Sequence, residues 1–314
     1  MHLTTAKKCS LIRPPLAGPS CSLDHRAVIL LALNRHNVMS AESASITMTP
    51  QAAVSGGLDR ASELQSSGKF AEAAIELEKS LQAARATPYE IEFVTRIRLG
   101  MTLADVYLSL NRIDDATSFL AEEVAFAERI SQIMQATGTV NQKRSAMSGY
   151  LQIRDRATQI GLLGRPAPQL DLDKWLVGNP VTFADLRGRV VMVEFWATWC
   201  KPCQEMFPKL TTLYEREAKR GLEILAITRH YMAYAGTPEA KAEELNLMRA
   251  VLAEHRVVFP VAVAADERLQ AVYGANGLPT VVLVDRHGVV RYAGPGGEDP
   301  AFEAQLQHCL AETV

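Results

Sequence analysis

The sequence predicts two folded parts, an all-α helical-repeat domain followed by an α/β domain. Apolar residues recur with a helical period over residues 58–164. From residue 165 onward, short apolar runs alternate with helical segments, which is typical of a sheet with crossover helices. The change of pattern falls at the sequence RPAP, residues 165–168, and proline disfavours helix in itself and in the residue before it. We therefore place a domain boundary there.

The composition is that of a folded protein without a strong charge bias. The chain has 314 residues, of which 48% are hydrophobic and 22% charged, and its net charge is −2. A chain with this balance has no overall positive charge that would attract the phosphate backbone of a nucleic acid, so we expect no nucleic-acid partner. No apolar run approaches the roughly 18 residues of a membrane-spanning helix, so we expect no membrane span. Five cysteines are too few and too unevenly spread for a disulfide scaffold.

Residues 1–57 differ from the rest because they contain no Phe, Trp or Tyr and few acidic residues. We expect a disordered extension or a targeting segment, since little apolar surface is available for burial. The apolar stretch at residues 27–33 is at the short limit for a secretory signal, and the Ser-rich composition also suits an organelle transit peptide. The sequence leaves the location unknown: it favours the cytoplasm, with an extracytoplasmic or organellar location through the N-terminal segment as the alternative. Translation could also start at Met39 or Met48.

The helical pattern over residues 58–164 contains a weak internal repeat with a spacing of 43 residues. Alanines at positions 61, 73, 104 and 116 would let paired helices approach closely, and Gly68 and Asn111 suit left-handed turns between them. Residues 68–81 and 111–124 resemble the turn and second helix of the tetratricopeptide repeat. A third helical stretch, at residues 131–160, would cap the pair. An ordinary helical bundle is the alternative, and either arrangement offers a docking surface for a protein partner.

Residues 165–314 form the predicted α/β domain. We expect strands at residues 190–196, 222–228, 257–263, 280–284 and 289–292. We expect helices near residues 203–220, 239–254, 267–273 and 300–312. The last two strands should form a hairpin, because only a short turn joins them.

Cys200 and Cys203 follow directly after an apolar strand, where the next helix begins. Ligand and catalytic sites of open α/β sheets gather at this end of the strands. The unpaired N–H groups of a helix N-terminus favour a thiolate at Cys200, and Lys201 adds positive charge. Two intervening residues allow the sulfurs to bond, and Pro202 fixes the helix start. The pair predicts redox chemistry. Half of a zinc site is one alternative, but no second pair of cysteines or histidines is placed to complete four ligands. A purely structural disulfide is the other alternative.

The expected reaction divides the work between the two thiols. The Cys200 thiolate attacks a substrate disulfide, and Cys203 then attacks Cys200 and releases the reduced product. Cys203 must lose a proton for that step. Glu194, six residues before Cys200, is expected to point into the packed face of the sheet, where burial raises its pKa and suits it to proton transfer. A structural carboxylate, satisfied by a neighbouring hydroxyl or water, is the alternative.

The sequence VVMVEFWATWCKPC, residues 190–203, followed by GLPT and VVLVDRHGVV, resembles the thioredoxin superfamily, most closely its TlpA/ResA-like branch, over about residues 166–310. The resemblance implies a thioredoxin-like fold and a thiol-disulfide oxidoreductase with a redox-active Cys200–Cys203 disulfide and no other cofactor or metal. It also implies that Pro279 is cis and packs against the disulfide, with the Leu278 backbone pairing to the substrate chain. Residues 167–189 look like the opening hairpin of this branch.

We expect substrate to be bound by Trp199, Lys201, Pro202, Leu278 and Pro279. The implied partners are protein disulfide substrates and an upstream dithiol reductant. Branch members that serve cytochrome c maturation often carry Glu three residues past the second cysteine, where this chain has Met206. That difference argues against the cytochrome role. A rival hypothesis is an adaptor that binds proteins through its repeats and uses the thioredoxin fold as a scaffold or redox sensor.

Other residues have simpler predicted roles. Arg229, His230 and Tyr231 follow a strand at the same sheet edge as Cys200, and we interpret them as a solvated loop rather than as substrate contacts. The remaining residues are expected in the core (Trp196, Cys309), in a turn (His287) and in the disordered extension (Cys9, Cys21).

Overall fold

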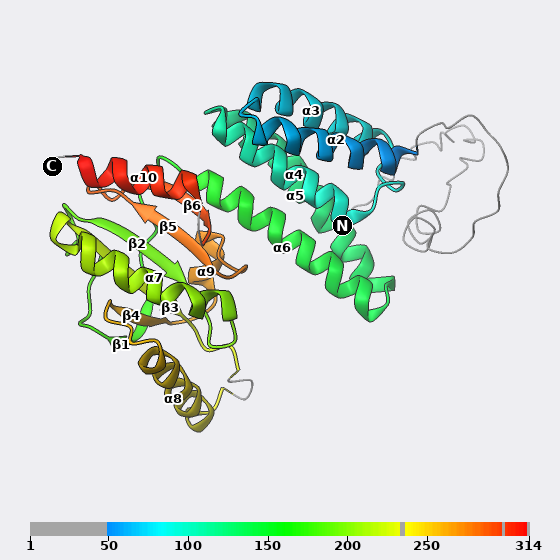
Figure 1. Cartoon of the computed structure of the whole chain (residues 1–314). Helices are drawn as coiled ribbons and strands as arrows, with labels where there is room; N and C mark the ends of the chain where they lie inside the picture. Colours follow the sequence, from blue (N-terminus) through cyan, green and yellow to red (C-terminus); the bar gives the residue numbers. More distant parts are fainter. Residues whose placement is uncertain (1–48, 233–235, 297–298, 313–314) are drawn as a thin grey trace, which may run out of the picture.

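The computed structural model describes residues 49–232, 236–296 and 299–312. Five helices, blue to green in Figure 1, lie beside an α/β domain built on one mixed sheet. Within these described ranges, no helix is long and apolar enough to cross a membrane. The predicted extension up to residue 48, with Cys9, Cys21, Met39 and the apolar stretch at 27–33, lies outside the described residues.

The five helices before the sheet are called the helical region. They are α2 (Pro50–Ser66), α3 (Phe70–Ala86), α4 (Phe93–Ser109), α5 (Ile113–Thr137) and α6 (Val140–Leu162). The first helix begins at Pro50, earlier than the predicted start at residue 58. Thr49 caps it by accepting a hydrogen bond from the Ala52 N–H, and Val54 is fully buried. The absence of aromatic residues before residue 58 therefore did not exclude a helix over residues 50–57.

The small residues of the sequence repeat lie where the helices touch. Ala61, Ala73, Ala104 and Ala116 are all fully buried, which is consistent with closely packed helix pairs. Gly68 and Asn111 both have positive φ, +73° and +55°, so the predicted left-handed turns are present. The third helical stretch is divided into two helices, because Thr139 and Gln142 form a capping box that starts α6.

The α/β domain contains the elements from β1 to α10. The strands are β1 (Leu172–Val177), β2 (Val190–Phe195), β3 (Leu222–Thr228), β4 (Val261–Ala264), β5 (Thr280–Val284) and β6 (Val290–Pro295). The helices are α7 (Lys201–Glu217) with the short 3-10 turn Ala218–Arg220, α8 (Pro238–Glu254), α9 (Arg268–Tyr273) and α10 (Pro300–Ala311). The strand order is β1-β4-β3-β2-β5-β6. Strands β2, β3 and β4 are parallel to one another. The pairs β1–β4, β2–β5 and β5–β6 are antiparallel.

Two predictions about the sheet were wrong. The strand expected at 257–263 begins only at Val261, because Phe259 turns into the core and Pro260 lacks the N–H that a ladder requires. The segment at 167–189 is not a hairpin: β1 crosses to the edge of the sheet and pairs with β4. Its side chains are mostly half-buried or exposed, which fits an edge strand, whereas β2 is buried throughout and needs neighbours on both sides.

Helices cover both faces of the sheet and bury its side chains alternately. Val190, Met192 and Trp196 pack in the core beneath α7, α8 and α10. Val191 and Val193 face the opposite core, which includes residues of α9. This alternation places Glu194 on the α7 face of β2, between Met192 and Trp196.

Candidate active site

The two cysteines lie at the N-terminus of α7, immediately beyond the carboxyl end of β2. Cys200 is the N-cap residue and Pro202 lies in the first turn. Cys200 and Cys203 form a disulfide, with 5.3 Å between their Cα atoms. The Cys203 N–H donates a hydrogen bond to the Cys200 sulfur at 3.3 Å. A negative charge on that sulfur would therefore meet a backbone donor and the positive end of the helix dipole.

The two cysteines are less exposed than a position at a helix tip suggested. Cys200 is 4% exposed and Cys203 is fully buried, because both pack in the apolar cluster beneath α7 that includes Trp196. Cys200 is still the more accessible of the two. Trp199, directly before it, is 59% exposed and gives this end of the helix an aromatic surface.

Glu194 is fully buried beneath α7, as the strand alternation predicts. Its neighbours across the sheet are Ala226 on β3 and Val281 on β5, and neither of those side chains has a polar group. Neither carboxyl oxygen has a hydrogen-bond partner among the described residues. Burial therefore raises the pKa of Glu194 well above its ordinary value. The alternative of a carboxylate satisfied by a neighbouring protein hydroxyl does not fit this geometry.

A second loop reaches the site between α9 and β5. The Leu278–Pro279 peptide bond is cis, as the resemblance implied. Leu278 is half-buried and packs against the same cluster that contains both cysteines, and Pro279 lines a pocket together with Pro202. The structure thus brings the two predicted substrate-binding segments, at 199–202 and 278–279, to one edge of the sheet.

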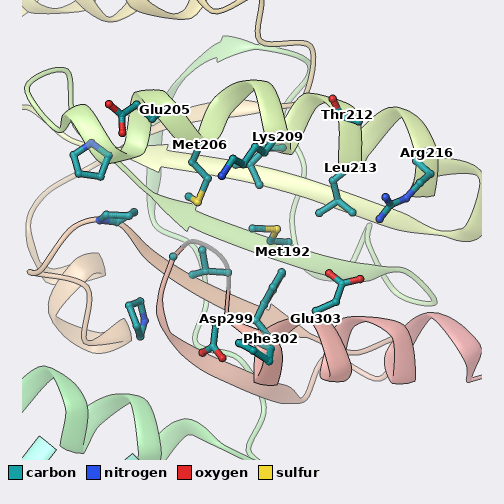
Figure 2. A pocket seen from close by; sticks show the side chains of 17 residues that line it. Met192, Glu205, Met206, Lys209, Thr212, Leu213, Arg216, Asp299, Phe302 and Glu303 are labelled. Atoms are coloured by element: carbon teal, nitrogen blue, oxygen red, sulfur yellow. The ribbon is translucent and has the colours of Figure 1, made fainter. Parts of the chain in front are cut away.

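That pocket has a volume of about 740 Å³ and lies between α7 and α10, over Met192 of β2 (Figure 2). Met206 of α7 and Phe302 of α10 contribute apolar surface, while Glu205 and Asp299 lie among its charged lining residues. Met206 is the residue that stands where cytochrome-maturation members often carry Glu. At this position the wall of the pocket is therefore an apolar side chain rather than a carboxylate.

The positive charge of Lys201 has less influence on the Cys200 thiol than the sequence suggested. Its side chain is exposed, and its ammonium group lies 3.8 Å from the carboxylate of Glu205, one turn further along α7. An exposed ion pair of this kind is screened by solvent. The donor geometry of the helix end is therefore the main local influence on Cys200.

The prediction of a solvated loop at residues 229–231 was wrong. Tyr231 packs edge-on against Trp199, with 5.4 Å between ring centroids. The Arg229 guanidinium donates to the Gln270 side chain, whose amide donates to the Tyr231 hydroxyl. These residues are ordered because the Glu244 carboxylate of α8 accepts hydrogen bonds from the backbone of the same loop. Only the position of Tyr231, at the end of a strand next to β2, could have indicated its contact with Trp199.

Three further residues lie where the sequence predicted them. Trp196 and Cys309 are fully buried in the core, and His287 lies exposed in the turn before β6. In the part of the chain that the structure describes, no group of three or more His, Cys, Asp or Glu side chains could hold a metal ion.

The comparison with protein-family models gives a match to the α/β part of the chain. The model of the AhpC/TSA family matches residues 163–293. The thiol-disulfide oxidoreductase ResA of Geobacillus thermodenitrificans is 32% identical over 129 residues, which are 41% of this chain and 67% of that protein. The ResA of Bacillus thuringiensis is 30% identical over 129 residues, 41% of this chain and 66% of that protein. The chain thus spans about two thirds of the length of these relatives.

Two solved structures that match part of this chain have low TM-scores. A putative thiol:disulfide interchange protein DsbE from Chlorobium tepidum is 28% identical, and the match covers 48% of this chain and 98% of that one, with a TM-score of 0.38. A thiol-disulfide isomerase from Corynebacterium glutamicum is 22% identical, with coverage of 48% and 98% and a TM-score of 0.41.

Proposed function

Because this chain belongs to the family of ResA-like thiol-disulfide oxidoreductases, which have a thioredoxin-like domain, we propose that it reduces or exchanges disulfide bonds in protein substrates. The observation that carries the proposal is the Cys200–Cys203 disulfide at the start of α7, with the buried Glu194 on the strand beneath. In thiol-disulfide exchange the electrons pass between sulfur atoms, so the Cys200–Cys203 pair is itself the redox group.

The first step forms a mixed disulfide. In the reduced protein the Cys200 thiolate attacks one sulfur of the substrate disulfide. A bond forms between Cys200 and that sulfur, and the other substrate sulfur leaves as a thiolate and takes a proton. The hydrogen bond from the Cys203 N–H supports Cys200 as the nucleophile, because it stabilises negative charge on that sulfur.

The second step releases the product. Cys203 loses its proton and attacks the Cys200 sulfur, which expels the second substrate thiolate and leaves the Cys200–Cys203 disulfide. The substrate gains two electrons and two protons. An upstream dithiol of the same chemical class then reduces the Cys200–Cys203 disulfide. Burial raises the pKa of Glu194 well above its ordinary value, which supports a role in moving the Cys203 proton, because such a carboxyl holds a proton more readily than an exposed one.

The substrate is proposed to lie across Trp199, Lys201, Pro202, Leu278 and Pro279. The exposed Trp199 ring and the apolar pocket beside Pro202 and Pro279 support this position, because both offer apolar surface next to the disulfide. The helical region, predicted over residues 58–164 and followed by the redox domain over 165–314, is proposed to dock protein partners. Its repeat of closely packed helix pairs is the feature that supports docking.

Insulin reduction by dithiothreitol, followed by turbidity, tests the proposal. We expect the wild-type chain to accelerate precipitation and Cys200→Ser to abolish the acceleration. Cys309→Ala is the matched control, because it removes a buried thiol on α10 and leaves the helix-tip pair intact. If the wild type is no faster than Cys200→Ser, the enzyme hypothesis fails and the adaptor hypothesis is favoured.

A further inference from the structure

One helix of the helical region makes a buried polar contact with the redox domain. On α6, Asp155, Arg156 and Gln159 are only 5%, 8% and 6% exposed, although all three have strongly polar side chains. They lie within about one turn of one another, and they bond to β6 and to the loop between α9 and β5. Buried polar groups at such a contact need specific partners.

Asp155 finds its partners in the loop that leads to the candidate active site. Its carboxylate accepts hydrogen bonds from the Asn276 N–H at 3.0 Å, the Asn276 side-chain amide at 2.8 Å and the Gly277 N–H at 3.2 Å. Two consecutive backbone amides therefore point at one carboxylate. Hydrogen bonds to an ionised acceptor are stronger than those between neutral groups.

The approach of the loop to α6 is close enough to require a glycine. Gly274 has φ +62°, and a Cβ at this position would lie 2.4 Å from the Asp155 carbonyl oxygen. The Gln159 side chain donates to the Gly274 carbonyl at 2.7 Å. The loop is thus held against the backbone of α6 over residues 274–277.

The held segment continues directly into the site. Gly277 is followed by Leu278 and Pro279, and the Gly277 carbonyl accepts a hydrogen bond from the Thr280 hydroxyl at 2.6 Å. Thr280 pairs with Phe195 of β2, the neighbour of Glu194. Only one residue therefore separates the Asp155 contact from Pro279, which lines the pocket beside Pro202.

We propose that Asp155 is a positioning residue for exchange with protein disulfides: its carboxylate fixes Asn276 and Gly277, and through them the Leu278–Pro279 segment that receives the substrate backbone. This inference rests on the proposed function. It gives the helical region a part in shaping the redox site in addition to docking. Misplacement of a substrate-binding segment weakens binding of an extended chain, whereas a small disulfide that makes no backbone pairing is unaffected.

The test compares two substrates across a short series of variants. Asp155→Ala should raise KM for insulin about tenfold and change kcat by less than about twofold, since the segment is displaced while the thiols are intact. The rate with a small aromatic disulfide should stay at the wild-type value. Asp155→Asn should restore most of the insulin KM, because an amide oxygen can still accept from the two backbone N–H groups.

Arg156→Ala is the matched control. Arg156 lies on the same helix and at the same contact, but its cross-domain bond is to the Ala293 carbonyl of β6, and its bond to the Gln159 side chain stays within α6. It makes no bond to Asn276 or Gly277. Its insulin KM should stay near the wild-type value. Hydrogen exchange at residues 274–281 gives a readout independent of catalysis: Asp155→Ala should exchange faster there, and Asp155→Asn should not.

The test distinguishes a failure of the proposed function from a failure of this inference alone. A wild-type chain no faster than Cys200→Ser with insulin overturns the proposed function and this inference with it. An active wild type with an unchanged insulin KM in Asp155→Ala overturns the inference alone. Equal losses with insulin and the small disulfide, or an equal KM rise in Arg156→Ala, would mean general loosening of the contact and would also overturn it.

Discussion

The backbone N–H of Cys203 donates a hydrogen bond to the sulfur of Cys200 at 3.3 Å, within the first turn of α7. The same donor can hold a thiolate when the pair is reduced. This relationship assigns different roles to two residues of the same type. Both cysteines pack in the same apolar cluster, but Cys200 also has a backbone donor and the helix dipole, whereas Cys203 is fully buried.

The reduced protein should therefore contain one acidic thiol. We predict that the Cys200 thiol ionises below the value of about 8.5 for free cysteine, because the helix N-terminus stabilises the thiolate. Thiolate absorbance in the ultraviolet, followed against pH, measures this ionisation. The acidic transition should be absent in Cys200→Ser and present in Cys309→Ala. A first ionisation at or above the free-cysteine value would refute the assignment.

Removal of the Glu194 carboxyl should slow the resolving step. Glu194→Gln keeps the shape of the side chain but removes the group that exchanges protons, so we predict a loss of about a hundredfold in the rate at which Cys203 resolves the mixed disulfide. Single-turnover kinetics with insulin separates this step from the attack by Cys200. The attack rate should stay close to the wild-type value. An unchanged resolving rate would leave Glu194 as a structural carboxyl.

The same substitution should change how stability depends on pH. The unfolded chain releases the Glu194 proton near pH 4.5, whereas burial raises the folded-state pKa well above that value. Between these two pKa values the Glu194 site binds more protons in the folded state, so the contribution of Glu194 to the free energy of unfolding falls as pH rises. Glu194→Gln lacks this contribution.

Denaturant unfolding of the oxidised proteins over a pH series measures the effect. We predict that the unfolding free energy of Glu194→Gln, relative to the wild type, increases from pH 4.5 upward and levels off above the folded-state pKa. All other titrating groups are shared and cancel in the difference. A difference that is independent of pH would contradict the buried, raised-pKa carboxyl.

Two glycines of α6 offer a matched test of packing in the helical region. A Cβ at Gly149 would lie 2.5 Å from the Phe93 ring, so Gly149→Ala should destabilise the protein by about 1–3 kcal/mol. A Cβ at Gly161, on the same helix, would meet no described atom within 4 Å beyond its own helical turn, so Gly161→Ala should stabilise by up to about 1 kcal/mol. Urea unfolding measures both changes. Effects of the same sign would argue against close packing of α6 on α4.

Features that depend on neighbouring residues in the chain could be predicted from the sequence. The helix start at Cys200 follows from the strand before it and from Pro202. The burial of Glu194 follows from the alternation of a strand that is apolar on both faces. The left-handed turn at Gly68 likewise has a local cause, because glycine adopts positive φ without strain.

Features that depend on which segments meet could not be predicted in this way. The contact of Asp155 with Gly277 joins residues 122 positions apart, and an aspartate within a helix gives no local sign of such a partner. The packing of Tyr231 on Trp199 requires β3 to lie beside β2. The pairing of β1 with β4 depends on the order of the whole sheet, which no single turn determines.

Trapping of the mixed disulfide tests the central claim most directly. A reduced Cys203→Ala variant, mixed with insulin, lacks the resolving thiol and should accumulate a covalent adduct through Cys200. We predict an adduct that intact-mass measurement detects, that dithiothreitol removes, and that is absent when Cys200 is also replaced by Ser. If no adduct forms, or if the same adduct forms without Cys200, the nucleophile assignment and the proposed exchange reaction are both wrong.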